Sequence, residues 1–187
     1  MKIMKQAIIL LMVVLSACST KSPETEIVES LYDYDVEERI RELGIELSEP
    51  GKPIANYVNA VQSGNLVFMA GKGPRGLDGT LVTGKVGIDL SIEQGYETAR
   101  LAAVAQLSAL KAEIGDLNRV ERIVKVFGMV NADPSFTNHS QVINGFSDLM
   151  VEIFGERGKH ARAAVGMGSL PMNMACEIEM IVQIKEY

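Results

Sequence analysis

The chain has 187 residues, of which 47% are hydrophobic and 22% are charged, and its formal net charge at pH 7 is −6. This length and composition predict one globular domain with some additional chain. Residues 24–49 hold ten acids and two bases and residues 1–23 hold three lysines, so residues 50–187 carry only −1. A near-neutral domain without a basic stripe argues against a nucleic-acid partner.

Residues 1–17 are predicted to be a secretory signal peptide, because two lysines precede an apolar run that is too short to span a bilayer. Leu15, Ser16 and Ala17 then precede Cys18 in a pattern that resembles the lipobox of bacterial lipoproteins, in which the cysteine is lipidated. Lipidation at Cys18 would anchor the protein to a membrane of the cell envelope, facing the periplasm or the exterior. Ordinary signal cleavage and a cytoplasmic location are the alternatives.

The segment that follows has two parts before the main domain. Residues 18–35 are polar and acidic and predict a tether between membrane and domain. Residues 36–47 carry apolar side chains at helical spacing up to Gly44, a typical residue at a helix C-terminus, so the segment 36–52 is expected to be a short helix and a linker. The main domain is expected over residues 53–187.

Two short strands are predicted at residues 57–61 and 65–70, joined as a hairpin. The glycine-rich segment 71–90 that follows matches the spacing of a dinucleotide-binding motif and of a phosphate loop. Both motifs require a helix directly after the glycines, and the sequence predicts none there. The glycines are therefore interpreted as turn residues with positive φ.

Residues 91–114 are predicted to form a long helix that opens with a capping box of Ser91 and Gln94. Residues 119–132 alternate apolar side chains toward both faces, which predicts a central strand covered on both sides. A second helix is expected over residues 137–155, with apolar residues on its inner face.

The last two strands are predicted over residues 161–169 and 175–184, and they contain Arg162 and Glu177. The order ββαβαββ predicts an α+β fold with two helices on one face of a mixed sheet. Because a short turn joins these strands, antiparallel pairing would bring Arg162 and Glu177 close together. A buried charge is costly unless it is paired or used. The two residues are therefore either an ion pair that stabilises the fold or a carboxylate clamp and an acid–base group in a cleft.

Other reactive residues are few. Besides Cys18, the only cysteine of the sequence is Cys176, and its only histidines are His139 and His160. Neither an intrachain disulfide nor a metal site is therefore expected. In the sequence, neither histidine has a serine or cysteine nucleophile at an interpretable spacing.

Three stretches together resemble the RidA (YjgF) family of enamine/imine deaminases: YVNAVQSGNLVFMAG, RVERIVKVFGMV and HARAAVGMGSLPMNMACEIEMIV. The resemblance covers roughly residues 53–185. It implies a chorismate-mutase-like fold, a homotrimer with clefts between subunits, and hydrolysis of 2-imino or 2-enamino acids to 2-keto acids and ammonia without a cofactor.

The resemblance also implies roles for individual residues. Arg162 would bind the carboxylate of the imine or keto acid, and Glu177 would place the water that attacks the imine carbon. Tyr57 and Gly71 would line the same cleft, and Asn144 is a candidate for the asparagine of the family's second helix.

Two positions depart from the family pattern. Lys72 stands where the family usually has glutamine, and Ala164 stands where it often has cysteine. These departures keep open an alternative: a non-catalytic trimer at the envelope that binds small carboxylates or a protein partner.

Overall fold

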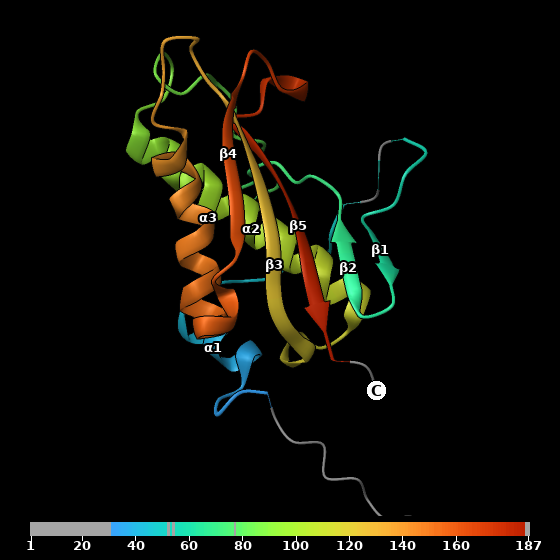
Figure 1. Cartoon of the computed structure of the whole chain (residues 1–187). Coiled ribbons are helices and arrows are strands. Elements are labelled where there is room, and N and C mark those ends of the chain that lie inside the picture. The colour runs from blue at the N-terminus through green and yellow to red at the C-terminus, as the bar shows by residue number, and fades with distance from the viewer. Residues whose placement is uncertain (1–30, 52, 54, 77, 186–187) are drawn as a thin grey trace, which may run out of the picture.

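The computed structural model describes residues 31–51, 53, 55–76 and 78–185 (Figure 1). The predicted signal peptide and Cys18 lie outside the described residues. Within the described part of the chain, no helix is long and apolar enough to cross a membrane.

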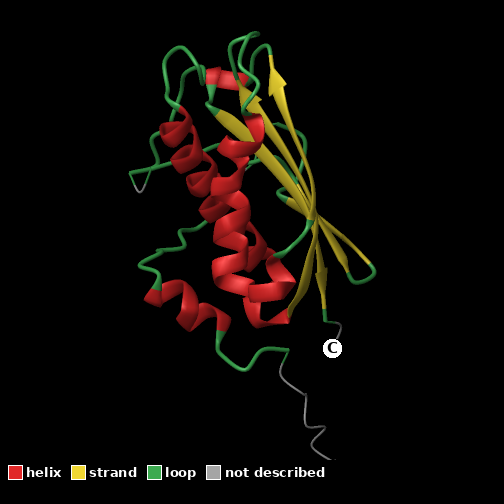
Figure 2. Ribbon diagram, turned by 60° about the vertical axis from the view of Figure 1, so that its left-hand side comes forward, coloured by secondary structure: helices red, strands yellow, loops and turns green. Residues whose placement is uncertain are grey.

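The main elements confirm the predicted ββαβαββ order, with one short helix in front of it. Their bounds are α1 (Val36–Glu42), β1 (Ala60–Ser63), β2 (Leu66–Met69), α2 (Ile92–Ile114), β3 (Val120–Asn131), α3 (His139–Phe154), β4 (Ala161–Met167) and β5 (Cys176–Ile184). The five strands form one mixed sheet in the order β1-β2-β5-β3-β4, in which only β3 and β4 run parallel. Helices α2 and α3 both pack on one face of this sheet, as predicted (Figure 2).

Helix α2 begins and ends where the sequence predicts. The Ser91 hydroxyl accepts from the backbone N–H of Gln94 (3.2 Å), and the Gln94 side chain accepts from the backbone N–H of Ser91 (2.9 Å), which completes the capping box. Gly115 ends the helix with a φ of 82°. Tyr96 is half-buried near the start of the helix, and its hydroxyl donates to Asp148 on α3 at 3.1 Å.

Helix α1 packs onto the domain through two buried side chains, Val36 and Ile40. It ends at Glu42, and Gly44 follows with the positive φ of 70° that favours glycine after a helix. An ion pair between Glu37 and Lys111 of α2, 2.5 Å long, ties the helix to the domain.

The hairpin of β1 and β2 is confirmed, but its first strand runs over Ala60–Ser63 instead of the predicted residues 57–61. Gly64 and Asn65 form its two-residue turn.

The described part of the glycine-rich segment 71–90 contains no helix, as expected. Gly79 and Gly84 have positive φ values of 80° and 122°, so they are turn glycines as predicted. Gly71, Gly73 and Gly76 do not have positive φ, so the prediction is wrong for these three. An added Cβ would instead overlap the Glu177 side chain at Gly71 and the Met174 sulfur at Gly73.

Strand β3 is central in the sheet, but helices cover only one of its faces. Phe127 and Met129 lie half-buried on the open face. An irregularity in the pairing with β5, between Ile123 and Lys125, turns Ile123 to the helix side together with Val126. Ile123 and Phe127, four residues apart, therefore lie on opposite faces, because a bulge interrupts strict alternation.

The expected pairing of the last two strands is also wrong. Strands β4 and β5 do not pair with each other, because β3 lies between them. The connection from β3 through α3 to β4 is a crossover, which makes β4 a parallel neighbour on one side of β3. Strand β5 then pairs antiparallel along the other side of β3.

Candidate active site

Arg162 lies near the start of the edge strand β4, and its side chain reaches α3. Its Nη1 donates to Oδ1 of Asn144 (3.0 Å) and to Oγ of Ser147 (2.9 Å), and its Nη2 makes a long bond to the carbonyl oxygen of Ser140 (3.5 Å). All three acceptors are neutral, and none of the ion pairs among the described residues includes Arg162. The half-buried guanidinium is therefore held in place but not neutralised.

The acceptors come from one stripe of α3. Asn144 and Ser147 are three residues apart, so they lie next to each other on the helix surface. The buried stripe of α3 packs on the sheet and leaves these two polar residues beside β4. Sequence reasoning named Asn144 as a candidate and missed Ser147, although the three-residue spacing was a usable signal.

His160 extends this cluster away from Arg162. Its Nε2 lies 3.0 Å from Oγ of Ser147, and its Nδ1 lies 2.7 Å from the carbonyl oxygen of Gly158. Burial lowers the pKa of His160, and the nearby charge of Arg162 lowers it further, against the opposing effect of the Gly158 carbonyl. The imidazole is therefore neutral at pH 7.

Glu177 lies on β5, where it alternates with the buried residues Cys176 and Ile178 and so faces the open side of the sheet. A Cβ placed on Gly71 would overlap its carboxylate, so the glycine makes room for Glu177. Burial raises the pKa of Glu177, and the neighbouring Glu179 raises it further. A carboxylate with a raised pKa is suited to accept a proton near neutral pH.

The four predicted site residues do not meet within one chain. Gly71 and Glu177 are in contact on the open face. Arg162 lies on β4 and contacts α3 on the helix side. Tyr57, which is 51% exposed, precedes β1 at the opposite edge of the sheet. The structure therefore excludes an ion pair between Arg162 and Glu177 of one chain.

The two departures from the family pattern have different surroundings. The Nζ of Lys72 donates to Oδ1 of Asn59 at 2.6 Å, and burial lowers the pKa of Lys72, as does the charge of Arg75 to a smaller degree. Ala164 packs against the hydrophobic core, two residues beyond Arg162.

The remaining reactive residues show no catalytic arrangement. The ring of His139 packs edge-on against Phe136, with 5.3 Å between ring centroids. Cys176 is fully buried, and burial raises the pKa of its thiol to about 12, so the thiol is protonated and unreactive at pH 7. In the described ranges, no three His, Cys, Asp or Glu residues are grouped so that they could hold a metal ion.

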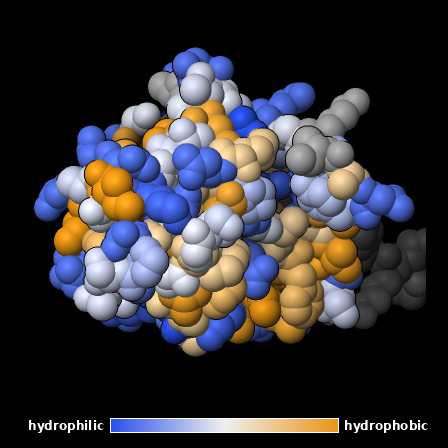
Figure 3. Space-filling model, turned by 90° about the horizontal axis from the view of Figure 1, so that it is seen from above, coloured by the Kyte–Doolittle hydropathy of each residue, from blue (hydrophilic) through white to orange (hydrophobic). Residues whose placement is uncertain are grey.

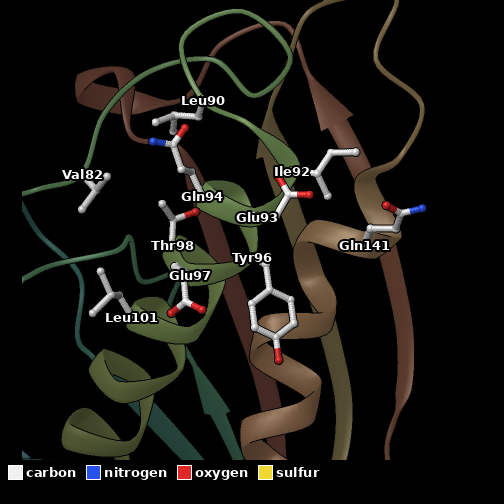
Figure 4. A pocket seen from close by; sticks show the side chains of 10 residues that line it. All are labelled: Val82, Leu90, Ile92, Glu93, Gln94, Tyr96, Glu97, Thr98, Leu101 and Gln141. Carbon is white, nitrogen blue, oxygen red and sulfur yellow. The ribbon is translucent and has the colours of Figure 1, made fainter.

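A hollow of about 710 Å³ lies over the first turns of α2, and Tyr57, Gly71, Arg162 and Glu177 are not among its lining residues (Figure 4). Its apolar lining includes Val82, Leu90 and Leu101, and its charged lining residues are Glu93 and Glu97. Two carboxylates would repel a carboxylate ligand, so this hollow does not suit a negatively charged ligand.

Comparison with known proteins identifies the chain's relatives. A family model described as "YjgF/chorismate mutase-like, putative endoribonuclease" matches residues 37–184. A solved structure of Atu1372 from Agrobacterium tumefaciens, described as a protein of unknown function, is 43% identical. It superimposes with a TM-score of 0.74, covering 80% of this chain and 94% of that chain.

Two curated proteins are similar as well. Protein TCP17 of Trypanosoma cruzi is 41% identical over 146 residues, which are 78% of this chain and 91% of the relative. The 2-iminobutanoate/2-iminopropanoate deaminase of Dermatophagoides farinae is 31% identical over 135 residues, which are 72% of this chain and 90% of the relative.

Proposed function

Because the chain belongs to the YjgF/chorismate mutase-like family, we propose that it hydrolyses reactive 2-imino or 2-enamino acids to 2-keto acids and ammonia. One observation carries this proposal: Arg162 presents a guanidinium that neutral partners hold and that no described carboxylate neutralises. The similarity to a protein named as a deaminase of two 2-imino acids supports the same substrate class.

In the proposed reaction, the planar fork of Arg162 binds the substrate carboxylate through two parallel hydrogen bonds. A water molecule attacks the imine carbon, and Glu177 accepts a proton from that water. Glu177 returns this proton to the nitrogen, which gives a carbinolamine. The hydroxyl proton of the carbinolamine then passes through Glu177 to the nitrogen, the carbon–nitrogen bond breaks, and ammonia leaves while the carbonyl of the keto acid forms. The raised pKa of Glu177 supports this role, because a general base accepts a proton more readily when its pKa lies closer to the working pH. The reaction needs water and no cofactor.

The proposed site is shared between subunits of a homotrimer. Within one chain Arg162 and Glu177 leave the sheet from different faces, so a common cleft requires Glu177 of the partner subunit. The open face supports assembly, because Val61 and Phe68 are register partners there and remain 55% and 43% exposed. Hydrophobic side chains gather along one side of the molecule, at the lower right of Figure 3. Apolar side chains exposed on one sheet face favour burial against another copy.

The test is direct. The purified full chain, mixed with freshly generated 2-iminopropanoate, is expected to speed the formation of pyruvate above the spontaneous rate. Arg162→Ala should lower the affinity for 2-oxobutanoate, a stable product analogue, by about 10- to 100-fold, because charged hydrogen bonds are lost. Binding of 2-oxobutanoate without any hydrolysis would favour the non-catalytic carboxylate-binding trimer.

A nucleolytic activity is the other candidate that the family description raises. The near-neutral charge of residues 50–187 speaks against it, because RNA binding depends on neutralising phosphates with basic side chains. Incubation of the same preparation with RNA is therefore expected to leave the RNA intact.

The proposed location is the cell envelope. The Leu15–Cys18 pattern after a short apolar run supports lipidation at Cys18. The polar segment 18–35 would then connect the lipid anchor to the folded domain.

A further inference from the structure

A continuous row of hydrogen bonds connects Arg162 to the backbone of the helical turn that follows α3. It runs from Nη1 of Arg162 to Oγ of Ser147 (2.9 Å), from there to Nε2 of His160 (3.0 Å), and from Nδ1 of His160 to the carbonyl oxygen of Gly158 (2.7 Å). All three side chains are half-buried, so water competes only in part for these bonds.

Only one arrangement of protons satisfies the row when the imidazole is neutral. A carbonyl oxygen can only accept, so Nδ1 of His160 carries the proton and Nε2 is left with a lone pair. Ser147 then donates its hydroxyl proton to Nε2 and offers its own lone pair to Arg162, which can only donate. Each group in the row thereby fixes the orientation of the next.

We propose that Ser147 and His160 are positioning residues for Arg162, which set the rotation of the guanidinium so that it meets a carboxylate in one defined orientation. This inference rests on the proposed function for the role of Arg162 as a clamp. Arginine loses considerable rotational freedom when it binds, and a side chain that is already held in place loses less. The ring of Phe146, edge-on at 6.3 Å, packs against His160 and holds the imidazole from the core side.

Removal of Ser147 or His160 is expected to weaken ligand binding by Arg162 only in part. Asn144 and the Ser140 carbonyl still hold Arg162 when Ser147 is removed. Loss of one such bond corresponds to a change of about 3- to 10-fold in affinity. Ser147→Ala and His160→Phe should therefore weaken 2-oxobutanoate binding by about this factor and raise KM in the deamination assay while kcat changes little. Ser147→Thr, which keeps the hydroxyl, should restore binding.

The matched control is Ser108→Ala on α2. Ser108 is also a serine within a long helix, and its hydroxyl donates to the carbonyl oxygen of Val104 at 2.9 Å, away from Arg162. This variant should bind 2-oxobutanoate like the wild type. If Ser147→Ala lowers the melting temperature but binds with wild-type affinity, Ser147 is merely structural and the proposal is overturned.

A second measurement tests the hydrogen bonds between Arg162, Ser147 and His160 without any ligand. Nitrogen NMR of the 15N-labelled full chain at pH 7 should show His160 with a protonated Nδ1 and an unprotonated Nε2, and Ser147→Ala should speed the rotation of the Arg162 guanidinium. The opposite tautomer, or an unchanged rotation, would overturn the positioning role, as would covalent labelling of Ser147 by a serine-directed fluorophosphonate. If the wild type binds no 2-keto acid although the NMR result holds, the proposed function fails and the row itself stands.

Discussion

Arg162 and Glu177 occupy strands that flank β3 on its two sides, and their side chains leave the sheet from opposite faces. Arg162 is the register partner of Val126 and bonds to α3, whereas Glu177 is the register partner of Met129. Val126 and Met129 are three residues apart on a regular stretch of β3, so they face opposite sides. A cleft that uses both charges must therefore combine two chains.

The first prediction follows from this geometry. Arg162→Ala and Glu177→Gln should each lose most of the activity, but mixed trimers of the two variants should regain activity. Random assembly would restore about one quarter of the clefts, because each cleft needs an intact Arg162 from one chain and an intact Glu177 from the next. Each variant, taken alone through the same dissociation and reassembly, is the control. Mixed trimers that form, as seen by native mass spectrometry, yet stay inactive would show that the site is not shared.

The second prediction concerns the contact of Gly71 with Glu177. Gly71→Ala places a methyl group where the Glu177 carboxylate lies, so the carboxylate must move. We expect the deamination rate to fall at least about 10-fold and the free energy of unfolding to fall by about 1–3 kcal/mol from overpacking. Gly168→Ala is the control, because no atom lies within 4 Å of its added Cβ and its φ is not positive. Equal activity of the two variants would contradict the proposed role of Glu177.

The third prediction uses the raised pKa of Glu177. The folded state binds a proton on Glu177 more tightly than the unfolded state does. The contribution of protonated Glu177 to the free energy of unfolding is therefore complete below the unfolded pKa and is lost as pH rises through the folded pKa. Glu177→Gln removes this loss. The variant should therefore melt above the wild type at pH 7 and show no such gain at about pH 4, while its deamination rate falls by about 10²–10⁴.

The exposed Glu113 supplies the control for this experiment. Glu113→Gln should leave the difference in melting temperature between the two pH values unchanged. A Glu177→Gln variant that melts below the wild type at pH 7 would mean that the ionised carboxylate stabilises the fold, contrary to the direction inferred here.

The fourth prediction tests the trimer. Light scattering should give three times the mass of the chain, and Phe68→Glu should weaken association by at least about 10-fold, because it puts a charge into an apolar contact. Ile88→Glu, at a position 63% exposed in a loop, is the matched control and should leave the trimer intact. A wild-type protein that is monomeric at micromolar concentration would contradict the proposed assembly.

The fifth prediction concerns the anchor. Cys18→Ser should release the protein from membranes or leave the precursor uncut, because no thiol remains to be lipidated. Cys176→Ala, which removes the buried cysteine and keeps Cys18, should leave membrane association unchanged. An unaltered membrane fraction and an unaltered mature mass of Cys18→Ser would count against lipidation.

Local features of this fold could be predicted from the sequence because neighbouring residues decide them. The capping box of Ser91 and Gln94, the end of α2 and the existence of the hairpin of β1 and β2 all depend on short-range hydrogen bonds and backbone angles. The inner face of α3 follows from a regular spacing of apolar residues. Arg162 and Glu177 could be singled out because charges are rare within apolar strands.

The order of the strands was decided only by the tertiary structure. A short link between two strands is compatible with a hairpin and equally with a step across a third strand. Here the crossover through α3 places β4 on one side of β3 and leaves the other side to β5. The bulge near Ile123 likewise changes which side chains face the core, and alternation in the sequence does not reveal it.

Long-range packing also decided which residues lie together around Arg162. Ser147 and His160 are thirteen residues apart in the sequence, and they meet because α3 packs beside β4 and brings the helix surface to the base of the strand. The sequence determined which residues carry charge and which segments bury their apolar faces. The packing of helix against sheet decided that Arg162 meets neutral acceptors on one side of the sheet while Glu177 faces the other, because hydrophobic burial fixes the orientation of whole elements and their polar residues follow.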